Sequence, residues 1–162
     1  MTVYKEIMTS ATAAKNELYS DLSDDVRQEL AQHERPATVS RGTPLVQRGI
    51  SPDQLIILNS GSAEVSVPVG GKALSLGIAG PGKVFALQSI LSGEAPHASV
   101  TCLEECNVTL LPKDAFLSVL QRNPQMYLAI IKILSADLAN ADEVIRDCGR
   151  SSKPRLGSTR LM

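Results

Sequence analysis

The sequence predicts a mainly β domain in which short antiparallel strands form a barrel or sandwich, with helices before and after it in the chain. Apolar residues recur with the helical period of about 3.6 before residue 35 and again after Pro112. Between Thr38 and Leu111 they recur with the strand period of about 2. Glycines interrupt that middle stretch at short intervals, as tight turns between short strands require. The length of 162 residues suits one domain.

Residues 1–34 are expected to form an N-terminal helical segment. The near-helical spacing of its first part is carried by Tyr4, Ile7, Met8, Ala11 and Leu18. A second helix is expected after Ser23, a suitable N-cap, because Asp24 and Asp25 then lie in the first turn, where the helix dipole favours anions. Pro36 should end it.

Two strand pairs are predicted in the middle of the chain. The first has alternating apolar residues on either side of a Gly70-Gly71 turn, namely Val65, Val67 and Val69, then Leu74, Leu76 and Ile78. The second alternates around a short acidic turn, with Ala98, Val100 and Cys102, then Cys106, Val108 and Leu110. Such pairs indicate an antiparallel barrel or sandwich.

Helices return after Pro112. Asp114 should cap a short helix, and Asn123-Pro124 should begin a long one. Apolar residues alternate at spacings of four and three along the long helix, at Tyr127, Ile131, Leu134, Leu138, Ala141, Ile145 and Cys148. This is the spacing of a coiled-coil seam, although the first three could instead pack on the barrel. Gly149 should end the helix, and the basic residues 149–162 should form a flexible tail.

Composition narrows the function. Sixteen Lys and Arg against 17 Asp and Glu leave a net charge of −1, which argues against a dedicated nucleic-acid-binding protein. Three cysteines argue against a disulfide scaffold and fit a reducing compartment. No stretch approaches the length of apolar residues that spans a membrane, and the N-terminus is unlike a signal peptide. We therefore expect a soluble, cytoplasmic protein with no membrane association.

Several short motifs resemble one family when they are taken in order. They are Arg41-Gly42, Arg48-Gly49, the run from Leu55 to Gly61, Gly82-Lys83-Val84-Phe85, and Pro112-Lys113-Asp114-Ala115-Phe116. Together they resemble a cyclic-nucleotide-binding domain, and in particular the sensor domains of catabolite-activator (Crp/Fnr) type transcription regulators. The resemblance implies an antiparallel jelly roll (a double-stranded β-helix) over residues 35–148, closed by C-terminal helices. It also implies a homodimer formed through the long helix.

The resemblance implies a nucleotide pocket whose contacts fall on Gly82, Phe85, Ala86, Leu87, His97, Ala98 and Ser99. The family's Gly-Glu pair falls on Ala86-Leu87, and its phosphate-binding Arg falls on His97. Loss of a charge-assisted partner costs about 2–5 kcal/mol, and a ribose hydroxyl without its acceptor costs about 1–3 kcal/mol. Affinity should therefore fall by about a hundredfold to a millionfold. We expect a degenerate site, with no certain cofactor.

A second candidate site is metal binding by Cys102, Cys106 and His97. A structural zinc ion usually needs four ligands, and both cysteines are in phase with apolar strand positions. We therefore expect no metal. His97 itself could hold an anion when protonated, or it could be an ordinary loop histidine. Ser99 could simply pair with backbone, and Phe85 suits the core.

These observations predict a stand-alone sensor or adaptor domain in bacterial signalling or transcription regulation, and not an enzyme. It would act by forming a homodimer and by binding a protein partner or an atypical ligand. The family's winged helix-turn-helix does not fit between Gly149 and Met162, so we expect no sequence-specific DNA binding by this chain. Two alternatives stay open: a regulatory domain that binds cyclic AMP, cyclic GMP or another small anion, and a cupin-like metal enzyme, which also uses a jelly roll.

Overall fold

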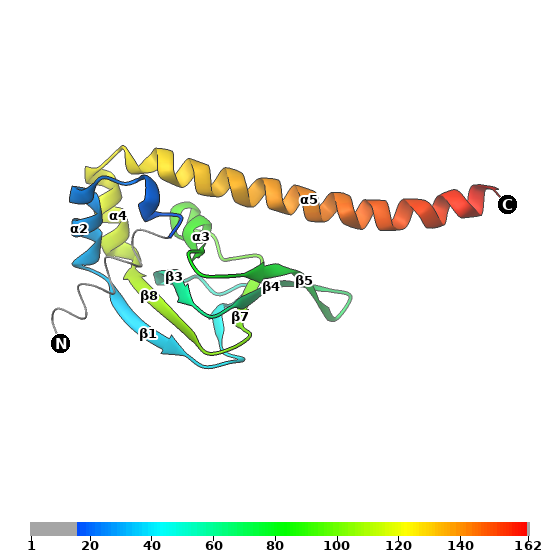
Figure 1. Ribbon diagram of the computed structural model, residues 1–162, viewed down its shortest axis with the longest axis horizontal. Coiled ribbons are helices and arrows are strands. Elements are labelled where there is room, and N and C mark those ends of the chain that lie inside the picture. The colour runs from blue at the N-terminus through cyan, green and yellow to red at the C-terminus, as the bar shows by residue number, and fades with distance from the viewer. Residues whose placement is uncertain (1–15, 162) are drawn as a thin grey trace.

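The computed structural model describes residues 16–161, with side chains described up to Asn140 and again at Asp142, Glu143, Arg146 and Asp147. Two antiparallel four-stranded sheets form the body, and a long helix crosses it and extends beyond it (Figure 1). The predicted mainly β architecture with flanking helices is confirmed. The first sheet has the order β1 (Arg35–Val39), β8 (Cys106–Pro112), β3 (Gln54–Ser60) and β6 (Val84–Phe85). The second has the order β2 (Pro44–Val46), β7 (Ser99–Cys102), β4 (Ala63–Val69) and β5 (Lys72–Ala79).

The helices gather at one end of the first sheet. They are the single turn η1 (Tyr19–Asp21), α2 (Asp24–Ala31), α3 (Leu87–Ser92), α4 (Lys113–Arg122) and α5 (Met126–Leu161). Helices α2 and α4 lie side by side next to the start of α5 (Figure 1). An ion pair between Arg122 and Glu29 joins α4 to α2. The helical elements pack against one face of the first sheet, where Leu55, Ile57 and Leu111 are buried among them.

Strand β3 is buried on both faces because it separates two apolar clusters. Leu55 and Ile57 belong to the helix cluster, which the helices and the first sheet form together. Ile56 and Leu58 belong to the inter-sheet cluster, which lies between the two sheets. Successive strand residues point to opposite faces, so an uninterrupted apolar run is what a doubly covered strand requires.

The predicted β4–β5 hairpin is confirmed. Val69 pairs with Lys72 across a turn in which Gly70 and Gly71 have φ values of 59° and 79°. Both values lie in the left-handed region that a tight two-residue hairpin turn uses, and glycine enters that region at little cost.

The second predicted strand pair is wrong. Strand β7 pairs with β2 and β4 in the second sheet, whereas β8 pairs with β1 and β3 in the first sheet. The acidic turn of residues 103–105 therefore carries the chain from one sheet to the other. Alternation shows which residues point inward, and it does so equally for a hairpin and for a crossing between sheets.

The N-terminal prediction is confirmed only in part. Helix α2 begins at Asp24 after Ser23, although the Ser23 side chain makes no capping hydrogen bond. It ends at Ala31, and Pro36 lies in β1 instead of marking the helix end. Strand β1 is at the edge of its sheet, where a proline without an N–H is tolerated. The helix expected around Tyr4 to Ala11 lies outside the described residues.

Helix α5 packs on the body through a face that differs from the predicted seam. Its buried residues are Met126, Ala129, Ile130 and Ile133, which follow the i, i+3, i+4, i+7 pattern of one helix face. Seam residues Tyr127 and Ile131 are 47% and 57% exposed, so the alternative that they pack on the β body is wrong. Leu134 is half-buried against the helix cluster.

The helix also extends further than predicted. It passes through Gly149 and continues to Leu161, so the expected stop at Gly149 is wrong. A glycine inside a helix lowers helix stability by about 1 kcal/mol relative to alanine, so a helix can end at a glycine but need not do so. Within residues 16–161, no helix combines the length and the apolar character needed to span a membrane.

Candidate ligand site

A cavity of about 950 Å³ opens between the second sheet, helix α3 and helix α5. Its walls are largely apolar and come from both sheets, including Val46, Val65, Leu76, Phe85 and Val100. The loop from Gly80 to Lys83 and the segment from Glu94 to Ala98 form its rim, and Asp137 and Asn140 of α5 lie across it. A concave site of this size suits a small organic molecule.

Most of the residues predicted for the site do lie together here. Gly82, Phe85, Ala86, Leu87, His97 and Ala98 line the cavity. Ser99 is not among the lining residues, and its hydroxyl accepts a hydrogen bond from the Arg48 backbone N–H at 3.0 Å. The interpretation of Ser99 as a partner for backbone is confirmed.

Two of these positions lack the chemistry of a nucleotide contact. Leu87 begins α3 and is 3% exposed, because its side chain packs in the helix cluster. It offers no acceptor to a ribose hydroxyl. His97 is exposed on the rim and takes the place of the arginine that the family resemblance implies. Phe85 is 6% exposed and belongs to the inter-sheet cluster, so it serves as core as well as wall.

Ala86 has an unusual backbone. Its φ of 72° places it in the left-handed region, and it is the only non-glycine residue of the described chain with a positive φ. Ala86 is the N-cap residue of α3. A side chain costs about 1–2 kcal/mol in this conformation, so the position favours glycine. The turn geometry is therefore kept although the glycine is absent.

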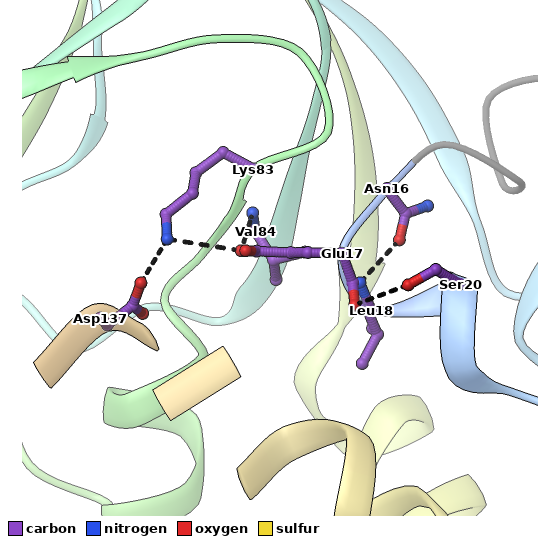
Figure 2. Close-up of polar contacts among 7 residues, drawn as sticks. All are labelled: Asn16, Glu17, Leu18, Ser20, Lys83, Val84 and Asp137. Atoms are coloured by element: carbon purple, nitrogen blue, oxygen red, sulfur yellow. Dashed lines mark hydrogen bonds and ion pairs between the residues drawn. The ribbon is translucent and has the colours of Figure 1, made fainter. Parts of the chain in front are cut away.

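Three charged residues meet at the polar end of the cavity, and we call them the clasp (Figure 2). The Lys83 ammonium forms an ion pair with the Asp137 carboxylate on α5 and lies 3.5 Å from Glu17 Oε1. Glu17 Oε1 also accepts a hydrogen bond from the Val84 N–H at 2.8 Å. The Glu17 N–H donates to the Gly82 carbonyl at 3.0 Å. The clasp thus joins the N-terminal segment, the β5–β6 loop and α5.

The surroundings of Glu17 perturb the pKa of its carboxyl. Desolvation raises the pKa of the Glu17 carboxyl above its usual value, while the Val84 N–H and the Lys83 ammonium partly oppose this rise. Glu17 is held in place from its other side by Asn16, whose Oδ1 accepts from the N–H groups of Leu18 and Tyr19 at 3.0 and 2.8 Å. The carboxylate is therefore positioned by backbone and not by Lys83 alone.

The sequence did not indicate the clasp. Lys83 occurs in one of the family motifs, but both of its partners lie far away in the chain, because Asp137 is 54 positions after it and Glu17 is 66 positions before it. Single charged residues at such separations carry no local signal. The nearest hint was the polar Asp137 and Asn140 beside the apolar stripe of the long helix.

The ionisable groups around the cavity are mainly acidic. Among the described lining residues, Lys83 is the only lysine or arginine, against the carboxylates of Glu17, Glu94 and Asp137. The ammonium of Lys83 is already paired with two of them. A phosphate would therefore be repelled by more charges than attract it, and no arginine is present among the described lining residues to bind it.

Cys102 and Cys106 both lie in the core of the β body. Cys102 and Cys106 are free and buried, and burial raises the pKa of the Cys102 thiol to about 11. Cys106 Sγ contacts the carbonyl oxygens of Ser62 and Glu104 at 3.4 Å. In the part of the chain that the structure describes, no three His, Cys, Asp or Glu side chains are grouped to hold a metal ion. Both buried cysteines serve here as small apolar core residues.

The outer surface of α5 carries a second candidate site. Tyr127, Ile131 and Leu138 are 47%, 57% and 72% exposed along one side of the helix. Leu134 continues the same stripe. The side chains of Ala141, Ile145 and Cys148, which complete the predicted seam, lie outside those that the structure describes. Exposed apolar residues at this spacing along a helix are typical of a contact with another helix.

Comparison with known proteins identifies the fold. The cyclic nucleotide-binding domain family matches residues 36–123, more than half of the chain. Comparison with the curated proteins finds no significant match. The Thermus thermophilus catabolite activator protein aligns with a TM-score of 0.71 and 21% identity, over 83% of this chain and 63% of that chain.

Two protein kinase A regulatory proteins are also similar in structure. The regulatory domain of Toxoplasma gondii protein kinase A, solved with cAMP, aligns with a TM-score of 0.66 and 20% identity, over 71% of this chain and 44% of that chain. The regulatory subunit of a cAMP-independent protein kinase A from Trypanosoma brucei aligns with a TM-score of 0.73 and 16% identity, over 90% and 52%. This chain thus spans less than two thirds of each of the three structures. The two sheets and the short helix α3 that follows Gly82 in the chain are consistent with the family match. The chain belongs to the cyclic nucleotide-binding domain family.

Proposed function

We propose that this chain is a sensor or adaptor domain of a bacterial signalling or transcription-regulating system, located in the cytoplasm, whose cavity is not a conventional cyclic-nucleotide site. It acts by binding and not by catalysis. The observation that carries the proposal is that the Lys83 ammonium already forms ion pairs with Glu17 and Asp137. Lys83 is the one lysine or arginine among the described lining residues. Leu87 and His97 support it, because neither supplies the charge-assisted contact of the family's pocket.

Calorimetric titration with cyclic AMP and cyclic GMP tests this proposal. The parent protein should show no binding at micromolar ligand. A double variant Leu87→Glu, His97→Arg whose circular dichroism matches the parent's should bind at least tenfold more tightly than the parent, because it supplies both missing contacts. Each single variant is the matched control and should gain less. Micromolar binding by the parent would favour the alternative, a genuine cyclic-nucleotide-binding regulatory domain.

We further propose that the domain is a homodimer joined through the exposed stripe of α5. The supporting observation is the exposure of Tyr127, Ile131 and Leu138, which the β body leaves uncovered. A partner helix would cover them, and burying a leucine side chain stabilises an interface by about 1.5–3 kcal/mol. Any reading of a DNA sequence would come from outside residues 16–161.

Sedimentation of a matched pair of variants tests the dimer. Leu138→Glu places like charges near the two-fold axis of the proposed interface and should give monomers with an intact β body. Ala139→Glu adds the same charge one position later, on a different side of the helix, and should stay dimeric. Equal dimer content in both variants would show that the stripe is not the interface.

A further inference from the structure

We infer that the cavity takes a ligand with an apolar body, hydrogen-bond donors at one end and no negative charge. This inference rests on the proposed function, because it treats the cavity as the site of a sensor domain that has departed from cyclic nucleotides. It goes further by naming the chemistry of the ligand. The observations that carry it are the wall composition, the balance of charge and the geometry of the clasp.

The walls favour an apolar body. Side chains from both sheets reach the cavity, among them Val46, Val65 and Val100, and Leu76 and Ile78 add to them from β5. Ile78 is 68% exposed, so a bound molecule would cover apolar surface that now meets water. Removing such surface from water favours binding in proportion to the area covered.

The polar end favours donors and disfavours anions. Carboxylates accept hydrogen bonds and donate none, and each has two oxygens with several acceptor positions. Glu17 and Asp137 use one oxygen each on Lys83, and Glu94 adds a third carboxylate at the rim. An amine or hydroxyl group on a ligand therefore finds acceptors here.

An anionic group would have to take Lys83 from its partners. Glu17 cannot follow the lysine away, because the Val84 N–H holds its carboxylate at 2.8 Å. Moving the ammonium towards an anion would leave this largely buried carboxylate without its cation. Even with His97 counted beside Lys83 as a cation, the three carboxylates among the described lining residues outnumber the two cations. Figure 2 shows the ammonium between its two carboxylates.

Three probes that share one naphthalene body test the inference at pH 7. They are 1-naphthylmethylamine, 1-naphthalenemethanol and 1-naphthaleneacetate, which carry a positive, a neutral and a negative group. Dissociation constants come from titrations followed by the backbone amide signals of Gly77, Gly80 and Gly82, which line the cavity. We expect the amine and the alcohol to bind at least tenfold more tightly than the acetate.

Charge variants then locate the cause. Asp137→Asn should weaken the amine about threefold to tenfold, strengthen the acetate and leave the alcohol unchanged. Asp21→Asn is the matched control, because Asp21 pairs with Lys132 of α5 but is not among the lining residues, and it should change none of the three constants. Circular dichroism of each variant checks that the fold is intact.

The outcomes separate this inference from the proposed function. The inferred class of ligand is wrong if the acetate binds as tightly as the amine, or if no probe shifts the glycine signals. Neither result contradicts the proposed sensor or adaptor role. Micromolar binding of cyclic AMP or cyclic GMP in the same titration overturns both. If the Asp137→Asn variant binds the three probes with the same dissociation constants as the parent, the carboxylates do not have the role inferred for them.

Discussion

Replacing Lys83 with methionine tests the energetics of the clasp. The side chain keeps most of its length and loses its charge, so the Glu17 carboxylate remains on the Val84 N–H without a cation. Lys83 is 27% exposed and Glu17 is 29% exposed, so the cost should fall below that of a fully buried broken pair. We expect the free energy of unfolding to fall by about 1–3 kcal/mol at pH 7.

Asp137→Asn should lower the free energy of unfolding much less than Lys83→Met does, because Glu17 still pairs with Lys83 in that variant. Asp137 is 42% exposed, and partly exposed ion pairs stabilise by about 0–1 kcal/mol. Urea unfolding of the two variants and of the double variant measures both costs and their coupling. The residues touch, so the effects should not be additive.

The cost of Lys83→Met should also depend on pH. Burial raises the pKa of Glu17, and Lys83 opposes that rise, so removing Lys83 raises the pKa further. A carboxyl whose pKa is higher in the folded than in the unfolded protein loses stabilisation as the pH increases through the folded value. The difference between variant and parent should therefore be small near pH 4 and grow towards pH 7. A difference independent of pH, or equal costs for Lys83→Met and Asp137→Asn, would refute this reasoning.

Two further predictions concern Ala86 and Tyr19. Ala86→Gly should raise the melting temperature, because glycine adopts the left-handed conformation without the cost that alanine has there. The gain should be only about 0.5–1 kcal/mol, because glycine also has more freedom in the unfolded chain. Ala86→Val should lower the melting temperature, and the reverse order of the two variants would contradict the strain argument. Tyr19 is 1% exposed and donates a hydrogen bond from its hydroxyl to Glu34, whose pKa burial raises. Tyr19→Phe should lower the free energy of unfolding by about 1–3 kcal/mol at pH 7, as measured by urea unfolding. The loss should be smaller near pH 4, where a protonated Glu34 does not need the hydrogen bond from the tyrosine hydroxyl. An equal loss at both pH values would show that the substitution affects packing alone.

The parts of the fold that the sequence predicted are those specified by local pattern. The Gly70-Gly71 hairpin and helix α2 depend on residues within a few positions of one another. The pairing of β7 and β8 was mistaken because the residues between them can close a hairpin or cross between sheets with the same alternation. Periodicity likewise predicted an apolar stripe on α5, but it could not show that a neighbouring face, at Ile130 and Ile133, is the buried one.

The candidate site divides in the same way. The resemblance to the cyclic nucleotide-binding family implied that Gly82, Leu87 and His97 surround one pocket, and all three line the cavity. The clasp could not be predicted, because its three charges come from the N-terminal segment, a loop and α5, and meet only after folding. The backbone of Ala86 also needed the structure, since alanine alone gives no sign of a left-handed conformation.

The length of α5 gives the domain a mechanical property. The helix has 36 residues, about 54 Å at 1.5 Å per residue, and Asp137 of the clasp lies near the end of its first third. The backbone beyond Asp137 extends for about 36 Å as far as Leu161. A rotation of about 10° at the clasp would move that end by about 6 Å, which is close to one helical pitch. In the proposed sensor, a tilt of this size about the clasp would carry a change in the cavity to the far end of α5, where a partner protein would meet it.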